Sequence, residues 1–431
     1  MKKKSINIGI IGFGNIGAAV ARNLKKNSAL IEERVGVPVR VKAVADKSSD
    51  ALKKAKAMGL AAEKSFDSLI NDPDIDVIVE SIGGDSPANK IIFDSIAHGK
   101  HVVTSNKEVV AKHLGHMINL AKKQNVSVSF EAAVGGGTPI ISPLRDGLSG
   151  NDISEVYGIV NGTTNYILSM MTEYGMEFKD ALVRAVRLGY AEANPSNDIE
   201  GVDSGYKSAI LASVAFGADV DHNNIYVEGI SHITQEDIRF ALEMGYVVKL
   251  VAVVKKVRGE LEVRVHPMLI PLGHQLASVS GNLNAIYIKG DPIGSVLLSA
   301  AGAGGDPTSS SVIGDIVEIA KRISSGDGPI SWRPLRKMKM RKPEDILSRY
   351  YLRLKAPDKF GVLAGISKAF ADAKVSIQAV VQKETVENSV TIVILIHEVP
   401  ESNLVRAVAR IRKLPVVKEI CNIIRVASGI I

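Results

Sequence analysis

Cysteine is almost absent from this chain. Cys421 is the only cysteine in 431 residues, which excludes an internal disulfide framework and a metal site built from cysteines. It also leaves a single possible thiol nucleophile, near the C-terminal end. The sequence therefore predicts a cytoplasmic protein.

Long hydrophobic runs are missing too. The strongest one, Val390–Ile396, has only the length of a strand, whereas a bilayer needs roughly 20 apolar residues. Met1–Lys4 leads directly into a strand-like stretch, without the apolar core of a secretion signal. We expect neither a membrane span nor a secretion signal.

The body of the chain has no excess of basic residues. The formal charge is 53 − 46 = +7. Lys2–Lys4 contribute three positive charges and Arg333–Lys342 contribute six, so the remainder carries 7 − 9 = −2. A nucleic-acid-binding surface needs a basic stripe with interleaved aromatic residues. The sequence thus predicts no nucleic-acid partner and no membrane partner.

The first 130 residues alternate short β-branched runs with longer amphipathic runs. The expected strands are Ile6–Ile11, Val39–Ala45, Asp76–Glu80, His101–Thr104 and Val126–Phe130, and the expected helices are Asn15–Lys26, Ala51–Met58, Pro87–Ala97 and Lys107–Gln124. This order predicts a parallel sheet covered on both faces, a Rossmann-like doubly wound NAD(P)-binding domain over residues 1–137. The helix expected at 306–324 would complete it.

Beyond Thr138 the pattern predicts a mixed α/β domain for catalysis and dimerisation over residues 138–325. Residues 326–348 are dense in glycine and proline and are predicted to form a linker. Residues 349–431 read as βαββαβ, a ferredoxin-like sandwich. The chain is therefore an α/β protein with three expected domains.

A glycine-rich turn follows the first expected strand. Gly12-Phe13-Gly14-Asn15-Ile16-Gly17 opens the first expected helix. Gly12 permits the tight turn, Gly14 lets the backbone approach a pyrophosphate, and Gly17 allows close packing of helix and sheet. This strand–turn–helix context favours dinucleotide binding over an ordinary glycine-rich turn.

The preference between NAD and NADP stays open. Asp46 ends the second expected strand, where a carboxylate accepts a hydrogen bond from the ribose of NAD. Lys47, Ser48 and Ser49 follow it, and Arg40 lies nearby; these side chains suit the 2′-phosphate of NADP. We expect either cofactor to be used.

The densest polar stretch runs from Gly189 to Lys207. Asp203 and Lys207 are four residues apart on one face of an expected helix, behind a segment that carries Glu192 and Asp198. This arrangement suits a zwitterion and supplies a proton donor, although a pair with this spacing can equally be an ordinary ion pair.

Four shorter segments point to the same chemistry. Thr104–Lys107 follows a sheet strand at the edge where such sheets bind ligands. Glu131–Thr138 is a glycine-rich stretch whose carbonyls suit a cation, or a hinge. Asn161–Asn165 offers amide and hydroxyl groups at a helix start, and Gly302–Asp306 is a second glycine-rich turn.

Together these residues resemble homoserine dehydrogenase, over the whole chain. The most specific match is the spacing of Asn194-Pro195, Asp198-Ile199, Gly201, Asp203 and Lys207. The resemblance implies interconversion of L-aspartate 4-semialdehyde and L-homoserine with NAD(P), in the threonine and methionine branch of amino-acid biosynthesis. A lysine beside the reacting oxygen would stabilise its charge and deliver the proton.

The resemblance also implies a role for individual residues. Lys207 would be the proton donor and acceptor, Asp203 its orienting partner, and Lys107 a second catalytic or cofactor-contacting lysine. The remaining expected contacts are, for the substrate, Glu192 (with its ammonium), Asp198, Asn161, Gly162 and Thr163; for the cofactor, residues 12–17, Asp46, Lys47, Ser81, Ser105 and Gly304; and for a sodium ion, main-chain atoms of Glu131, Val134, Gly136 and Thr138.

The C-terminal unit resembles an ACT domain, a ligand-sensing module that pairs with another copy of itself. The turn from Ala356 to Leu363 carries this match. The resemblance implies feedback inhibition by L-threonine, with Asp358, Gly361 and Gln378 at the effector site, and a homodimer or homotetramer. A structural dimerisation module without a ligand is the alternative. No kinase-sized extension precedes the nucleotide turn, so we expect a monofunctional enzyme.

Three rival functions fit these residues less well. A non-catalytic sensor of nucleotides and amino acids would have no need of Lys107, Glu192, Asp203 and Lys207 together. A different amino-acid dehydrogenase is disfavoured by the spacing from Asn194 to Lys207. Oxidation of the same aldehyde to an acyl phosphate needs a cysteine nucleophile, and Cys421 lies in the last expected strand.

Overall fold

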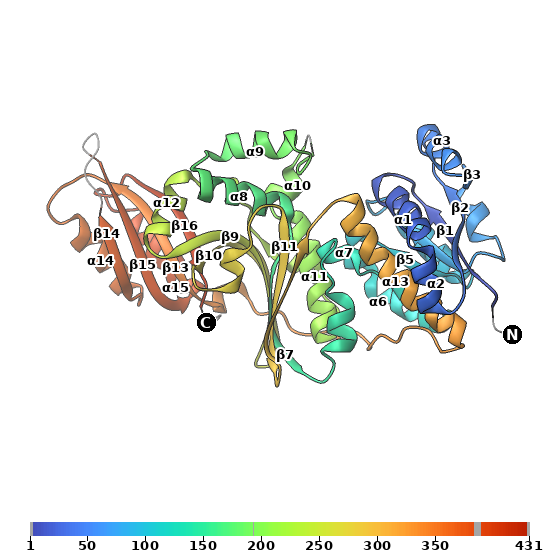
Figure 1. The fold of residues 1–431 in the computed structure, drawn as a ribbon. Coiled ribbons are helices and arrows are strands. Elements are labelled where there is room, and N and C mark those ends of the chain that lie inside the picture. Colours follow the sequence, from blue (N-terminus) through green and yellow to red (C-terminus); the bar gives the residue numbers. More distant parts are fainter. Residues whose placement is uncertain (1–2, 193, 383–388, 429–431) are drawn as a thin grey trace. The chain divides into compact units, whose positions relative to one another are not determined.

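The structure is a computed structural model that describes residues 3–192, 194–382 and 389–428 (Figure 1). The chain forms two compact units. The first unit comprises Met1–Val156, Tyr206–Ile225 and Leu283–Met338, and the second comprises Tyr157–Gly205, Tyr226–Asn282 and Lys339–Ile431. The division falls inside strand β7 (Asp152–Ile159) and helix α11 (Val202–Phe216).

A six-stranded parallel sheet forms the core of the first unit. Its order is β3-β2-β1-β4-β5-β6. The strands are β1 Ile6–Ile11, β2 Val39–Ala45, β3 Ala61–Glu63, β4 Val77–Glu80, β5 His101–Thr104 and β6 Val128–Ser129. The central strands are mostly apolar because helices cover both faces. The predicted doubly wound domain is confirmed, with the strand order of a dinucleotide-binding sheet.

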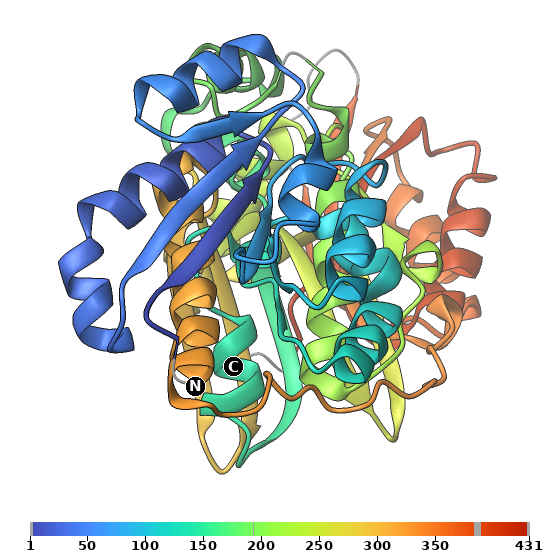
Figure 2. The ribbon, with the colours of Figure 1, turned by 90° about the vertical axis from the view of Figure 1, so that its right-hand side faces the viewer.

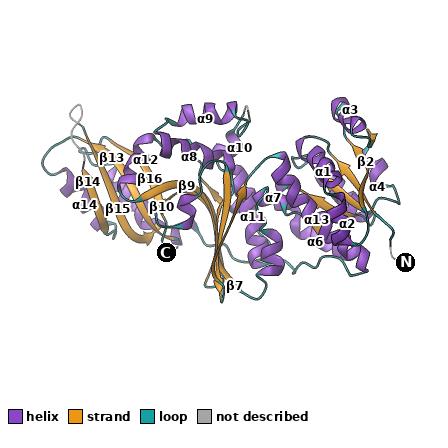
Figure 3. Ribbon diagram, in the orientation of Figure 1, coloured by secondary structure: helices purple, strands orange, loops and turns teal. Residues whose placement is uncertain are grey.

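The helices that flank this sheet are α1 Asn15–Lys26, α2 Ser28–Val35, α3 Ser49–Ala57, α4 Phe66–Ile70, α5 Ala88–Ala97, α6 Lys107–Gln124 and α7 Ala132–Gly135. Helices α1, α3, α5 and α6 fall close to the predicted ranges, whereas α2, α4 and α7 were not predicted (Figure 3). A later helix, α13 (Gly305–Ser325), packs on α1 and contributes Val312, Ile316 and Ile319 to the same core. Figure 2 shows α13 in orange beside the blue N-terminal elements.

Elsewhere in the first unit, β11 (Leu283–Asp291) and β12 (Gly294–Ala301) form an antiparallel hairpin. The π-helix η1 (Pro143–Gly147) and the short 3₁₀ helix η2 (His222–Asn224) complete this unit. The segment after α13 is irregular, and side-chain contacts hold it in place. Trp332 stacks on Phe130 with 4.7 Å between ring centroids and donates from Nε1 to the carbonyl of Val128 at 3.0 Å.

The second unit contains a sheet of order β9-β10-β16-β13-β15-β14, with β8 beside β10. The strands are β8 Tyr226–Val227, β9 Tyr246–Val257, β10 Glu260–Pro271, β13 Leu347–Ala356, β14 Ile377–Gln382, β15 Val390–Pro400 and β16 Glu419–Val426. The helices are α8 Gly162–Tyr174, α9 Phe178–Arg187, α10 Ser196–Ile199, α12 Gln235–Glu243, α14 Val362–Asp372 and α15 Glu401–Ile411, with 3₁₀ turns η3 Gln275–Ser278 and η4 Pro343–Asp345.

The C-terminal βαββαβ order is confirmed, but this part is joined to the preceding strands. Met268 and Leu269 of β10 pair in parallel with Arg425 and Val426 of β16. The β9–β10 hairpin and the C-terminal strands therefore share one sheet. No helix in the described residues is both long and apolar enough to cross a membrane.

Candidate active site

The glycine-rich turn adopts the geometry that a pyrophosphate requires. Gly12 has a φ of +92°, which favours glycine. A Cβ atom on Gly17 would lie 2.1 Å from the carbonyl oxygen of Gly12, so only glycine fits there, whereas a Cβ on Gly14 would meet nothing within 4 Å. The surface above Gly14 is thus open to a ligand at the N-terminus of α1.

Side chains from neighbouring strands hold this turn. Asp46 accepts from the amide of Phe13 at 2.6 Å and from that of Ser48 at 2.8 Å. Ser81 donates from Oγ to the carbonyl of Gly12 at 2.8 Å. The sequence predicts a cofactor contact for Asp46 but does not reveal that its carboxylate also fixes the conformation of the glycine-rich turn. Its carboxylate has acceptor positions for both.

The carboxyl ends of β4 and β5 present the next predicted group. Asn106 caps α6 by accepting from the amides of Glu108 and Val109, so that Lys107 is the first helical residue and Ser105 precedes the cap. Thr104 donates to the buried carboxyl of Glu80 at 2.5 Å. Burial raises the pKa of Glu80, although its hydrogen bonds oppose that shift. The sequence gives no sign that Glu80, at the end of an expected strand, is a buried carboxyl.

Two glycine-rich turns meet in the first unit. A Cβ on Gly136 would lie 2.1 Å from the carbonyl oxygen of Gly302, and one on Gly305 would lie 3.3 Å from the carbonyl oxygen of Asn15. The turn that contains Gly304 thus packs between residues 135–137 and the start of α1. Ser311 donates to the carbonyl of Gly136 at 2.7 Å.

The side chain of Glu131 is committed to the backbone. It accepts from the amides of Ile140, Ile141 and Ser142 at 2.5 to 2.8 Å. Any cation at this segment must therefore use main-chain carbonyls, as the resemblance implied. Asp315 accepts from the amide of Glu131 at 2.9 Å, and burial raises its pKa well above the usual range. The described residues contain no group of three or more His, Cys, Asp or Glu side chains that could hold a metal.

The second unit gathers four of the predicted substrate residues. Asn161 caps α8 by accepting from the amide of Thr164 at 2.9 Å, and its amide nitrogen donates to Asp198 at 2.7 Å and to Asp203 at 3.0 Å. Thr163 donates to the carbonyl of Tyr190 and approaches Asp198 at 3.3 Å.

Two further predicted residues flank this group. A Cβ on Gly162 would lie 2.7 Å from the carbonyl oxygen of Asn282, so glycine is required at that position. Glu192 is exposed. Lys207 is four residues after Asp203 on α11, one helical turn away. The lysines at 107 and 207 and the phosphate turn belong to the first unit, and the carboxylate group belongs to the second.

A separate cavity of about 170 Å³ lies at the start of α14. Asp358 and Gly361, two of the residues predicted for the effector site, line it, and Gln382 lines it as well. Gln378 does not. Its side-chain oxygen accepts from Arg349 at 2.5 Å on an exposed part of β14.

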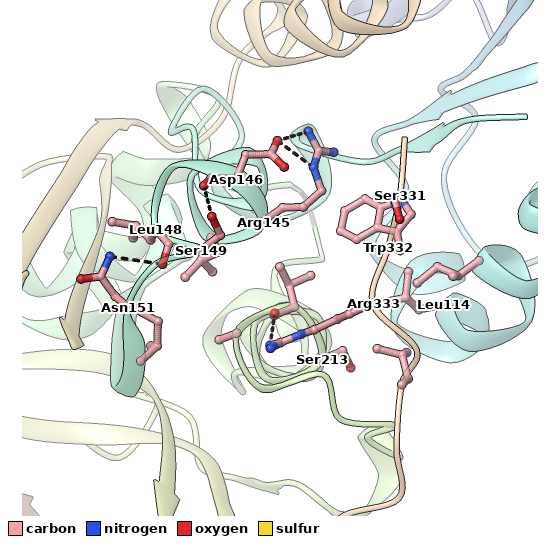
Figure 4. Close-up of a pocket in the computed structure, with 16 residues that line it drawn as sticks. Leu114, Arg145, Asp146, Leu148, Ser149, Asn151, Ser213, Ser331, Trp332 and Arg333 are labelled. Carbon is pink, nitrogen blue, oxygen red and sulfur yellow. Dashed lines mark hydrogen bonds and ion pairs between the residues drawn. The ribbon is translucent and has the colours of Figure 1, made fainter. Parts of the chain in front are cut away.

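The cavity in Figure 4 measures about 390 Å³ and belongs to the first unit. It lies among η1, α6, the end of α11 and residues 331–335. Arg145 is neutralised by Asp146 and Glu318, and Arg333 donates to the carbonyl of Val214 at 2.7 Å. No residue of the predicted site lines it.

The sheet order, the open glycine turn and the lysine and carboxylate groups define a nicotinamide-dependent dehydrogenase. Comparison with known proteins identifies the family. Residues 12–131 match the homoserine dehydrogenase NAD-binding domain, residues 139–317 match homoserine dehydrogenase, and residues 350–416 match the ACT domain. The chain belongs to the homoserine dehydrogenase family.

Relatives match over their whole length. A homoserine dehydrogenase from Neisseria gonorrhoeae is 39% identical over 99% of both chains, and one from Helicobacter pylori is 40% identical over 99% of this chain and 100% of its own. The crystal structure of a homoserine dehydrogenase from Thiobacillus denitrificans has a TM-score of 0.94 at 40% identity and covers 99% of this chain and 100% of its own. A hyperthermophilic archaeal homoserine dehydrogenase in complex with NADPH has a TM-score of 0.62 at 31% identity, over 73% of this chain and 97% of its own.

Proposed function

We propose that this protein reduces L-aspartate 4-semialdehyde to L-homoserine, with hydride from NADH or NADPH and a proton from Lys207. The observation that carries this proposal is the amide of Asn161, which donates to both Asp198 and Asp203. It fixes two carboxylates at the start of α8, one of them a single helical turn before Lys207.

Each predicted residue takes a defined role in this reaction. Glu192 binds the substrate ammonium, while Asp198, Gly162 and Thr163 form the floor of the substrate site. Asp203 orients the ammonium group of Lys207, which stabilises the negative charge on the aldehyde oxygen and then protonates it. Lys107, at the start of α6, contacts the cofactor or the same oxygen.

The nicotinamide cofactor supplies the hydride, and the protein binds and orients it. The turn at 12–17 holds the pyrophosphate, with Asp46 and Lys47 at the ribose and Ser81, Ser105 and Gly304 along the remaining path. NADPH in the archaeal relative supports use of the phosphorylated cofactor. Asp46 supports NAD, so the proposal includes both.

A sodium ion on the carbonyls of Glu131, Val134, Gly136 and Thr138 belongs to the same proposal. Backbone amides already occupy the carboxylate of Glu131, so this residue would offer its main-chain carbonyl oxygen to the ion. Carbonyl oxygens suit a hard monovalent cation.

The cavity at Asp358 and Gly361 supports binding of L-threonine as a feedback inhibitor. A product of the threonine and methionine branch would then limit its own synthesis. ACT modules pair with one another, which supports a homodimer or homotetramer. The single cysteine favours a cytoplasmic location.

The test is an assay of the purified protein with aspartate semialdehyde and each reduced nicotinamide. We expect oxidation of NADPH or NADH that depends on the aldehyde. Tight binding of both ligands without turnover would instead support the alternative, a non-catalytic nucleotide and amino-acid sensor.

The effector site has its own test. Asp358→Asn should raise the threonine concentration for half-inhibition at least fivefold, whereas Asp372→Asn, at the exposed C-terminal end of α14, should leave it unchanged. Equal sensitivity of both variants and the wild type would place the effector elsewhere.

A further inference from the structure

A small polar cavity of about 40 Å³ lies in the second unit, at the junction of β10 with β13 and β16. Arg264 of β10 and Arg425 of β16 line it, together with Lys255, Ser348 and Glu398. Its volume admits one small ion or about three to four water molecules, because one water molecule needs roughly 10–15 Å³ of cavity volume. None of its residues belongs to the substrate, cofactor or effector sites described above.

Arg264, which lines this cavity, carries buried donors without a partner. Its side chain is 6% exposed. Its Nη2 donates to Ser348 at 3.1 Å and lies 3.0 Å from Glu262, which leaves Nε and Nη1 with no hydrogen-bond partner in the described part of the chain. Buried donors without a partner are rare in folded proteins because their desolvation is costly.

Arg425 supplies a third donor. Its side chain is 8% exposed, and its two terminal nitrogens bind Glu228 at 2.8 Å and Glu401 at 2.6 Å. The Nε atom lacks a partner among residues 3–192, 194–382 and 389–428. The two carboxylates and the ring of Tyr226, 4.8 Å from the guanidinium, fix its orientation. It cannot turn away without losing those contacts.

The two guanidinium groups also repel each other. The positive charge of Arg425 lowers the pKa of Arg264, in addition to the larger effect of burial, while Glu262 opposes that shift. Lys255 adds a further positive charge to the cavity lining, and the exposed Glu398 adds a negative one. An anion placed between the two arginines would relieve this repulsion.

We propose that this cavity binds a small monovalent anion, a halide such as chloride. One halide accepts hydrogen bonds from all three orphan N–H groups, whereas each water molecule in the same space also needs acceptors for its own two protons. The ion would link β10 to the C-terminal strands at the point where Met268 pairs with Arg425. It would therefore stabilise the attachment of the C-terminal βαββαβ unit to the β9–β10 hairpin.

The first test measures the melting temperature of the full chain while chloride replaces gluconate at constant sodium and ionic strength. We expect a saturable rise of roughly 2–4 °C, reproduced by bromide. Arg264→Lys keeps the charge but loses the planar fork of donors, so its rise should require at least tenfold more chloride. The matched control is Arg406→Gln, at an exposed position of α15, and its melting response to chloride should equal that of the wild type.

The second test locates the ion directly. Crystals grown in sodium bromide should show an anomalous peak between Arg264 and Arg425. Residues 429–431 follow Ser428, which lines the cavity, so a variant shortened after Ser428 must keep the same halide response. A halide response only in the shortened chain would mean that the tail occupies the cavity, and the proposal would fail. It fails equally if no peak appears, if a peak appears without a saturable melting response, or if Arg264→Lys matches the wild type.

Discussion

Removal of Arg353 should expose the energetic cost of a buried carboxylate. Asp237 is fully buried and accepts from Nε of Arg353 at 2.6 Å and from its Nη2 at 3.1 Å. Asn422 donates to the same carboxylate at 2.8 Å and Tyr351 at 3.2 Å. This group joins α12 to strands β13 and β16. Arg353→Met keeps the approximate length of the side chain and removes the one cation that bonds Asp237 within the described residues.

The magnitude follows from leaving that charge behind. Breaking one partner of a buried pair costs about 3–5 kcal/mol, because the remaining charge is desolvated without compensation. We expect a loss of this size in the free energy of unfolding, measured by urea denaturation followed by circular dichroism. Arg406 is an exposed residue of α15 that donates to Asn403, so Arg406→Met should lose less than about 0.5 kcal/mol.

The pH dependence of this loss has a definite sign. In the wild type, Arg353 and the other donors hold the pKa of Asp237 below its usual range despite burial. That stability is present above the unfolded pKa and is lost as the pH falls through the folded one. In Arg353→Met, burial dominates and raises the pKa of Asp237, so the variant loses stability as the pH rises. The gap between variant and wild type should therefore be smaller at pH 5 than at pH 8.

Asp237→Asn combined with Arg353→Met should recover part of the loss, since no buried charge is then unpaired. A gap below about 1 kcal/mol at pH 8 would refute the reasoning, because that is the range of an exposed ion pair.

Three further predictions concern the first unit and the β9 strand. Gly14→Ala should keep the wild-type melting temperature and weaken NADPH binding at least tenfold in a fluorescence titration, whereas Gly17→Ala should lower the melting temperature as well; equal melting temperatures would contradict this. Burial lowers the pKa of His101 to about 4, so stability should fall by about 3 kcal/mol from pH 7 to pH 4 and His101→Gln should flatten that slope in urea titrations. Burial lowers the pKa of Lys249 to about 8, so stability should rise between pH 8 and 10.5; a slope unchanged in Lys249→Met would rule out this lysine as its cause.

Local signals were enough to place several helices from the sequence. The predicted bounds of α1 and α6 agree with the structure. For α1 the glycine turn marks the start, and Asn106 and Asn125 cap the two ends of α6. Strand β12 was not predicted because its serines and small residues give no clean alternation and most of its positions are half-exposed or exposed.

The pairing of strands that are distant in the chain could not be predicted from the sequence. Local patterns separate the C-terminal unit from the rest, while the pairing of β10 with β16 joins them across more than 150 residues. The position of Gln378 outside the cavity lining has a related cause. A bulge lies between Ile377 and Ala379 in the pairing of β14 with β15, so Gln378 is the extra residue there and leaves the cavity lining to Gln382.

The candidate site was predicted through its motifs, and its supporting residues were not. Asn161, Thr163, Asp198 and Asp203 come together as the resemblance implied. Glu80 and Asp315 went unnoticed, because an isolated carboxylate in an apolar stretch gives no signal until tertiary packing buries it.

The most direct measurement is a single turnover of Lys207→Met preloaded with NADPH and mixed rapidly with aspartate semialdehyde. Hydride transfer, seen as loss of the reduced nicotinamide absorbance, should slow by roughly 10²–10⁴-fold while NADPH affinity stays within about twofold of wild type. Lys179→Met, an exposed lysine on α9, should transfer hydride at the wild-type rate. A Lys207→Met protein that retained the wild-type rate would show that another group donates the proton.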